Sequence, residues 1–307
     1  ILGNLMAEGV DLDQGFYRSA TLAGFTAILM WSLLAALTVA TGAVPPFQLA
    51  AVCFAIGGAL GLIWTSIRGE LRLLTGQPLS VWLHGVGGIF GYHFFYFTAL
   101  RHGSPAEVSL IAYLWPLLIV LFSAALPGHR LKVHHVVGAV LGFVGVAVIV
   151  LGRGRGLIIT EPVGYLAAGA CALIWSTYSV SNRIFSKVPT SLVTGFCLVS
   201  SFLAGICHLL FEQTLWPQTA LAWWAVLGLG VGPVGLAFFV WDYGCKQGDL
   251  RVLGAGAYLA PLLSTAALLA LGLESPRLSI ILAAFLITGG AMIAARDLIR
   301  RRSSASR

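Results

Sequence analysis

Twelve side chains in this sequence could contact a small molecule, and most of them are aromatic rather than ionisable. They are Trp31, Tyr92, His93, Tyr96, Tyr113, Trp115, Trp175, Tyr178, Ser179, Asn182, Trp241 and Tyr258. Aromatic rings stack on one another and attract ammonium groups, while Ser179 and Asn182 can hydrogen-bond the polar end of a ligand. The predicted chemistry is reversible binding. For any single ring, packing between helices is an alternative that the sequence leaves open.

The motifs of catalysis and metal binding are absent from the sequence. There is no G-x-S-x-G, no H-E-x-x-H, no Walker loop and no pair of aspartates within an apolar run. The histidines at 129, 134 and 135 cluster without a neighbouring carboxylate or cysteine, which favours a solvated loop over a metal site. The five cysteines lie at no metal-ligand spacing, so we expect packing roles for them. We therefore predict no enzyme activity, no metal and no cofactor.

Three carboxylates could couple transport to an ion, and each has a structural alternative. Glu107 follows Ser104-Pro105, the pattern of a helix capping box. Asp242 has Lys246 and Arg251 close by in sequence, which favours an ion pair, and Glu212 ends an apolar run and is expected at the outer surface of the membrane. The sequence thus offers no convincing coupling carboxylate.

Two histidines lie inside an apolar segment. A polar ring at membrane depth must find a partner or a wet cavity, so His84 and His93 each need one. For His93, which is flanked by Tyr92 and Phe94, a position facing a cavity and a packed position both stay open.

The composition places these side chains in a membrane. Hydrophobic residues make up 58% of the chain and charged ones 9%, against about 25% charged residues in a soluble domain. Apolar runs long enough to cross the bilayer are predicted to be helices, because hydrocarbon cannot satisfy exposed backbone groups. They cover residues 19–41, 47–67, 80–100, 105–126, 134–151, 163–183, 190–211, 219–243, 250–272 and 279–296.

The two halves of the chain repeat each other. At an offset of 145 residues Tyr113 matches Tyr258 and Pro116 matches Pro261, and at an offset of 144 Trp31 matches Trp175. Five helices per copy is an odd number, so the second copy must be inverted in the membrane. We predict an all-α polytopic protein of ten transmembrane helices, arranged as two inverted five-helix repeats around a central cavity. The divisions are a lead at 1–18, repeats at 19–152 and 153–297, and a basic tail at 298–307.

The distribution of lysine and arginine predicts the topology. With both termini in the cytoplasm, 14 of the 18 basic residues fall on the cytoplasmic side and four outside, as the positive-inside rule requires. The net charge of +7 comes mainly from loops and the tail. It therefore reports topology next to lipid, and no nucleic acid partner is expected.

Paired prolines and glycines are the candidate hinges. Pro116 and Pro261 each remove one hydrogen bond within a helix, and Gly88 and Gly232 lie in glycine-rich stretches at corresponding places in the two halves. In carriers built from inverted repeats, such broken helices surround a substrate site near the midplane of the bilayer. Tight packing of helices through small residues is the alternative.

The sequence resembles a known family of carriers. A-L-R-H-G at 99–103 followed by A-Y-L-W-P-L-L at 112–118, matched by G-C-K-Q-G and A-Y-L-A-P-L-L at 244–263, is similar to the EamA-type branch of the drug/metabolite transporter superfamily. The aromatic segments at 92–96 and 113–116 resemble, more narrowly, the aromatic amino acid exporters of bacterial inner membranes.

The resemblance implies a function and a site. It implies export of aromatic and other neutral amino acids, with methyl viologen-like compounds as further substrates, by alternating access through a cavity of helices 1, 3, 4, 6, 8 and 9. We expect a monomer that runs by facilitated diffusion. The alternatives are a proton-coupled exporter of drugs or metabolites with the same fold, and a membrane scaffold without transport activity.

Overall fold

The computed structural model describes residues 2–102, 108, 111–126, 131–151, 162–272 and 278–294. Within these residues the chain is helical and contains no strand, which confirms the all-α prediction for the described part. Glu107, His129 and the basic tail lie outside the described residues.

The first half of the chain forms six described α-helices and two short 3₁₀ turns, η1 (Leu71–Leu74) and η2 (Ser123–Ala125). The helices are α1 (Leu2–Ser32), α2 (Leu34–Ala40), α3 (Pro46–Ile67), α4 (Leu79–His102), α6 (Trp115–Phe122) and α7 (Val133–Leu151).

The second half repeats this order with different interruptions. The 3₁₀ turn η3 (Thr190–Leu192) precedes its second helix, and the π-helical turn η4 (Gly232–Leu236) interrupts its third. The helices are α8 (Pro162–Ser181), α9 (Val193–Phe211), α10 (Ala220–Val231), α11 (Ala237–Gln247), α12 (Leu250–Gly256), α13 (Leu259–Ala270) and α14 (Leu278–Ala294).

Several of these helices can cross a membrane. Six described stretches are long and apolar enough, and three shorter apolar helices accompany them, so this is a multi-pass membrane protein. The six are Gly15–Ala40, Pro46–Ile67, Pro162–Ser181, Thr190–Phe211, Ala220–Gln247 and Leu250–Ala267. Helix α4 has the length of a span, 24 residues, but its histidines and tyrosines make it less apolar than these six.

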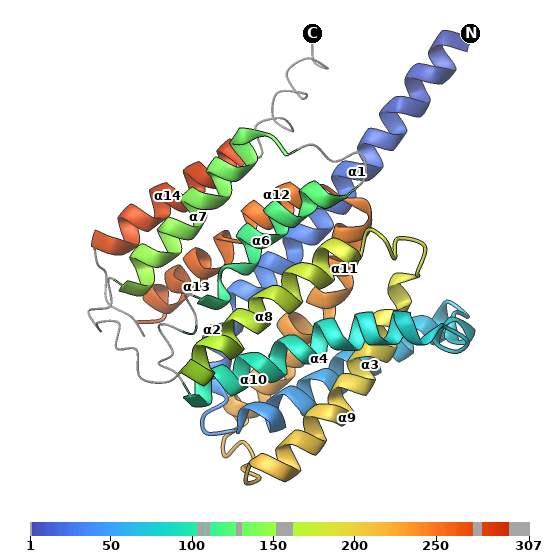
Figure 1. The fold of residues 1–307 in the computed structure, drawn as a ribbon. Coiled ribbons are helices and arrows are strands. Elements are labelled where there is room, and N and C mark those ends of the chain that lie inside the picture. The colour runs from blue at the N-terminus through green and yellow to red at the C-terminus, as the bar shows by residue number, and fades with distance from the viewer. Residues whose placement is uncertain are drawn as a thin grey trace.

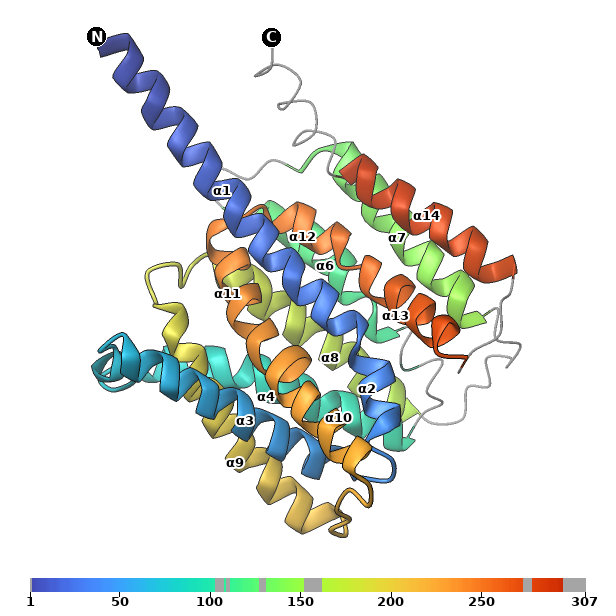
Figure 2. The ribbon, with the colours of Figure 1, turned by 180° about the vertical axis from the view of Figure 1, so that it is seen from behind.

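The helices pack in pairs that join the two halves. α3 lies against α9, α7 against α14, α4 against α8 and α1 against α11 (Figures 1 and 2). In the repeat, α1 corresponds to α8 and α4 corresponds to α11. Exchanging the two halves therefore turns the pair α4–α8 into the pair α11–α1, and the set of pairs stays the same. In two of these pairs, glycines let one helix backbone lie directly on the other: a Cβ on Gly244 would lie 2.7 Å from the Cα of Gly24, and a Cβ on Gly138 would lie 2.5 Å from the carbonyl oxygen of Gly290.

The helix breaks lie at the matched prolines. A turn at Tyr113 and Leu114 precedes α6, and a turn at Ala257 and Tyr258 separates α12 from α13, so both breaks come just before Pro116 and Pro261. The backbone N–H of Leu117, at the start of α6, donates to the hydroxyl of Tyr258 at 3.2 Å. Tyr258, at the break in the second half, therefore supplies an acceptor for a backbone N–H group that follows the break in the first half.

Two of the three candidate carboxylates, Asp242 and Glu212, lie within the described residues. Asp242 pairs with Lys246 at 2.8 Å, as expected, whereas Arg251 pairs with Asp249. Glu212 directly follows α9, at the end of the bundle where α3 begins, and its side chain is only 3% exposed; its expected place at the outer surface of the membrane stays a prediction. Glu212 accepts hydrogen bonds from the backbone N–H groups of Phe47 and Gln48, because the first turn of α3 has donors without partners inside the helix.

Candidate functional site

A central cavity of about 480 Å³ lies among the helices of both halves. Its walls come from α1, α2, the start of α3, α4, α6, α8, η4, α11 and the start of α13. The volume is typical of a site for a small organic molecule. The cavity extends to Val39, Val44 and Leu100, near the end of the bundle where α2 connects to α3. We call this the open end, and the opposite end, where α8 finishes and α9 begins, the closed end.

The cavity brings together residues that are far apart in the sequence. Seven of the twelve candidate binding residues line it: Trp31, Tyr92, His93, Tyr96, Tyr113, Trp115 and Trp175. Sequence reasoning missed Phe97, Phe238 and Thr38, which line it too. Phe238 could have been found, because it is the match of His93 at the repeat offset of 145. Thr38 carries the same signal, because it is the match of Asn182 at the repeat offset of 144.

Four tryptophans from four helices form what we call the tryptophan floor: Trp31, Trp115, Trp175 and Trp241. The ring centroid of Trp31 lies 5.0 Å from that of Trp241, 5.7 Å from Trp175 and 6.2 Å from Trp115. Two indole N–H groups are fixed by hydrogen bonds, one from Trp31 to the carbonyl of Pro233 at 3.0 Å and one from Trp241 to the hydroxyl of Ser179 at 3.1 Å. The floor bounds the cavity on the side of the closed end.

The carbonyl that Trp31 uses is freed by local structure. Pro233 follows Gly232 in η4, where the helix widens into a π turn, and such turns recur at functional sites. The sequence G-P at 232–233 thus creates an acceptor that positions a ring of the cavity.

The described lining residues carry no Asp, Glu, Lys or Arg. Among them His93 contributes an imidazole whose Nδ1 lies 2.8 Å from the carbonyl oxygen of Ile89. Since a carbonyl only accepts, Nδ1 is the donor, and in the neutral ring Nε2 is left as an acceptor. The cavity therefore presents aromatic faces and neutral polar groups.

The other five candidate residues are buried outside the cavity lining. Tyr258 holds the break before α6, and Trp241 completes the floor. Tyr178, Ser179 and Asn182 lie on α8 or just after it, and each is at most 3% exposed. No observation here tests whether these five, or the seven in the cavity, contact a substrate, so all twelve stay predictions.

A second polar group lies between the floor and the closed end. We call it the lower polar cluster and define it as His84, Tyr178, Asn182, Asp242 and Lys246. The Nε2 of His84 lies 2.9 Å from the Oδ1 of Asn182, and the rings of His84 and Tyr178 are 4.9 Å apart. His84, which needed a partner at membrane depth, finds one in Asn182.

Hydrogen bonds tie this cluster to the segment between α8 and α9. Thr190 donates to the Oδ2 of Asp242 at 2.6 Å, and the Nζ of Lys246 donates to the carbonyl of Val188 at 2.9 Å. The guanidinium of Arg183 donates to the carbonyls of Lys246 and Gly248. These contacts seal the closed end.

The candidate hinges occupy distinct environments. A Cβ on Gly88 would lie 2.3 Å from the ring of Tyr178, so Gly88 permits close packing of α4 on α8. Gly232 has open space around it and begins the π turn. Pro116 and Pro261 follow the two breaks described above. Their role as moving hinges stays a prediction.

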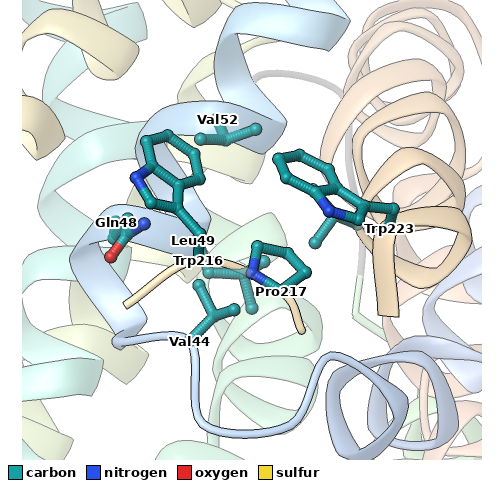
Figure 3. Close-up of a pocket in the computed structure, with 8 residues that line it drawn as sticks. Val44, Gln48, Leu49, Val52, Trp216, Pro217 and Trp223 are labelled. Carbon is teal, nitrogen blue, oxygen red and sulfur yellow. The ribbon is translucent and has the colours of Figure 1, made fainter. Parts of the chain in front are cut away.

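A smaller pocket beside the open end is shown in Figure 3, where Trp216 and Trp223 face it. Its empty space is about 10 Å³, enough for one water molecule, so it cannot hold the predicted substrate. Among the described residues there is no group of three metal-binding side chains.

Comparison with known proteins gives a consistent family match. The EamA-like transporter family matches residues 18–151 and again residues 162–296. The chain is 54% identical over 286 residues to "Aromatic amino acid exporter YddG" of Ancylobacter novellus, with 92% of this chain and 99% of the relative covered.

More distant relatives carry the same name. The protein of that name from Escherichia coli is 29% identical over 296 residues, with 90% of this chain and 96% of the relative covered. A solved structure titled "Crystal structure of protein" superposes with a TM-score of 0.88 at 53% identity, covering 93% of this chain and 98% of that one.

Proposed function

Because the chain belongs to the EamA-like transporter family, we propose that it exports aromatic and other neutral amino acids across the bacterial inner membrane, with methyl viologen-like compounds as further substrates. The observation that carries this proposal is the cavity, which is large enough for an amino acid and whose described lining residues are mainly apolar and aromatic, with no Asp, Glu, Lys or Arg among them. The names of the relatives support the same substrate class.

The cavity can hold both ends of such a substrate. An aromatic side chain can stack among Tyr92, Trp115 and Trp175, and each good ring pair adds about 0.5–1.5 kcal/mol beyond burial. An ammonium group can lie over a ring face by cation–π attraction, or donate to the Nε2 of His93. Without a fixed charge in the lining, binding is weak and selectivity is broad, which suits release of cargo at the open end.

We also propose the topology. Ten transmembrane helices form two inverted repeats, at 19–152 and 153–297, and both termini are cytoplasmic. Two observations support this arrangement. The set of helix pairs stays the same when the two halves are exchanged, and the basic residues are distributed as the positive-inside rule requires. The open end then faces the outside of the cell and the closed end faces the cytoplasm. The working unit is a monomer in lipid.

Transport by this route needs no ion gradient. Alternating access follows if the closed end opens while the open end closes, with motion at the breaks before Pro116 and Pro261. Of the carboxylates considered for coupling, Asp242 pairs with Lys246, and Glu212 is held by backbone N–H groups and lies 3.6 Å from Arg101. This engagement supports facilitated diffusion over proton coupling.

Uptake into liposomes tests the proposal. Purified protein is reconstituted and given labelled phenylalanine, tryptophan, threonine or glutamate, with protein-free liposomes as the blank. We expect saturable uptake of the first three, each inhibited by the others and not by glutamate. Uptake that collapses when a pH gradient is removed at fixed voltage would favour the proton-coupled exporter. No uptake of any amino acid by folded protein would contradict the substrate class.

A further inference from the structure

Several buried polar atoms at the closed end are poorly satisfied among the described residues. The Oδ1 of Asp242 and the hydroxyl of Thr194 have no hydrogen-bond partner, and the hydroxyl of Tyr178 and the Nδ2 of Asn182 contact only each other, without a well-formed hydrogen bond. Each of these residues is at most 3% exposed. Such atoms are uncommon in native proteins, since an unpaired buried donor or acceptor is costly. Tyr178, Asn182 and Asp242 all belong to the lower polar cluster.

The repeat shows what these residues correspond to in the other half. At offset 144, Leu34 matches Tyr178, Thr38 matches Asn182 and Ala50 matches Thr194. At offset 145, Phe97 matches Asp242 and His84 matches Leu229. The partners Leu34, Thr38, Ala50, Phe97 and Leu229 all line the open cavity. The residues with poorly satisfied atoms thus occupy the positions that the repeat makes equivalent to a cavity wall.

From this equivalence we propose that the lower polar cluster is a binding site for the charged head group of an amino acid, formed when the closed end opens. If the two repeats exchange conformations, the wall now built by Leu34, Thr38 and Phe97 is built by Tyr178, Asn182 and Asp242. The inference rests on the proposed function and adds a site on the opposite side of the tryptophan floor from the open cavity.

The chemistry of the cluster fits a zwitterion. The free Oδ1 of Asp242 and the hydroxyl of Tyr178 accept hydrogen bonds from an ammonium group. The Nδ2 of Asn182, released from its contact with Tyr178, donates to a carboxylate. The head group therefore supplies partners to the poorly satisfied atoms. The equivalent positions in the open cavity, Leu34 and Phe97, offer neither charge nor hydrogen bond.

This difference gives the transporter a direction-dependent affinity. The closed end, once open, holds the head group by charge-assisted hydrogen bonds, whereas the open end holds only the side chain by its aromatic walls. An exporter benefits from this difference in affinity, because it binds its substrate on the cytoplasmic side and releases it outside.

Two variants test the site. Tyr178→Phe removes a hydroxyl whose polar contact in this state is with Asn182, so folding loses only that weak contact; Asp242→Asn keeps the size of the side chain and removes its charge. Labelled phenylalanine uptake is measured in inverted membrane vesicles, whose outward-facing surface is cytoplasmic, with vesicles lacking the protein as the blank. We expect the half-saturation concentration to rise about tenfold or more in Asp242→Asn, since it loses a hydrogen bond between charged groups, and severalfold in Tyr178→Phe.

Head-group analogues separate binding from a structural effect. In wild-type inverted vesicles, phenylalanine should compete better than 3-phenylpropionate, which lacks the ammonium group, and better than phenylalaninamide, which lacks the carboxylate. Asp242→Asn should reduce the advantage over 3-phenylpropionate. In right-side-out vesicles the wild type should discriminate less among the three compounds, because the open cavity has no charged lining.

Ser200→Ala is the matched control. Its hydroxyl is also buried without a partner, but its repeat match, Ile56, is not among the residues that line the cavity. We expect wild-type kinetics from it. The inference is overturned if both test variants stay within twofold of wild type with unchanged discrimination, or if Ser200→Ala changes as much as they do. If wild-type vesicles transport no amino acid at all, the proposed function fails first and the site falls with it.

Discussion

At the scale of single residues, the cavity depends on rings that contact one another across helices. Trp175 lies 5.3 Å from Tyr92 and 5.8 Å from Phe238, measured between ring centroids. Tyr92 is parallel to Tyr96 at 5.9 Å. Each ring of a substrate must enter this arrangement, so removing one ring changes both the shape and the attraction of the wall.

We expect Trp175→Ala and Tyr92→Ala to lower the rate of phenylalanine transport about tenfold, because each removes stacking partners worth about 0.5–1.5 kcal/mol apiece. The measurement is initial uptake into liposomes, normalised to the amount of protein in the membrane. Trp224→Ala is the control, since that ring is 69% exposed and lies outside the cavity lining. Unchanged transport in both variants would place the substrate elsewhere.

The sequence allowed part of this site to be predicted. Tyr92 and Tyr96 are four residues apart, so helical spacing alone puts them on one face. Tyr178 and Asn182 follow Trp175 on the same face of α8, yet they lie below the floor, because Trp31 and Trp241 arrive from other helices and close the cavity between them. Packing between helices, which periodicity within one helix cannot give, decides which residues face the cavity.

At the scale of elements, α4 contains neighbouring glycines with opposite surroundings. A Cβ on Gly88 would clash with the ring of Tyr178, whereas a Cβ on Gly87 meets nothing within 4 Å. The glycines of α4 therefore serve different contacts: Gly88 is needed for the contact with α8, whereas Gly87 is not.

We expect Gly88→Ala to destabilise the protein by about 1–3 kcal/mol, the usual cost of overpacking, and to lower transport because α8 carries Trp175. Gly87→Ala in the same helix should be neutral or stabilising by up to about 1 kcal/mol, since alanine favours helix. Thermal unfolding in detergent compares the two. Equal losses would show that flexibility of the glycine segment, and not contact with Tyr178, is what matters.

A second element-scale case is the start of α12. The carboxylate of Asp249 accepts hydrogen bonds from the backbone N–H groups of Arg251 and Val252 and pairs with the guanidinium of Arg251. Burial alone raises the pKa of Asp249, but the hydrogen bonds and charge of Arg251 outweigh it, so the pKa is lowered. The folded state therefore favours the ionised form.

We expect Asp249→Ala to cost about 0.5–2 kcal/mol, as loss of a helix N-cap does, and Asp249→Asn to cost less because asparagine still caps. Because the folded pKa is depressed, the stabilisation is present above the ordinary aspartate value of about 3.9 and is lost as the pH falls through the lower folded value. Thermal unfolding of wild type and Asp249→Ala across that range checks the sign. A difference that grows as the pH falls would contradict it.

The breaks in the helices were predictable only where proline marks them. Pro116 and Pro261 lie just after the interruptions of their helices, as their missing N–H groups require. The π turn at Gly232–Leu236 likewise contains Pro233. The interruption between α1 and α2 at Leu33 has no proline or glycine beside it, so it follows from tertiary packing.

At the scale of the whole molecule, the repeat makes two sets of positions equivalent while the structure treats them differently. Thr38 is exposed beside the cavity, and its match Asn182 is 1% exposed at the closed end. A molecule with one end open and the other sealed has this asymmetry even though its two halves share one sequence pattern. The difference in exposure between two matched positions therefore shows which end of the cavity is open.

Cysteine accessibility at such a matched pair tests the orientation. In a background with all five native cysteines changed to alanine and transport retained, Thr38→Cys should react with a membrane-impermeant thiol reagent added to intact cells, because the open end faces outside. Asn182→Cys should react only in inverted vesicles, and faster while substrate is being transported, since opening of the closed end exposes it. Leu166→Cys, on an exposed side chain outside the cavity lining, should react from neither side because lipid covers it. If Asn182→Cys reacts in intact cells while Thr38→Cys needs inverted vesicles, the bundle is inserted the other way round, and the basic residues do not set its topology.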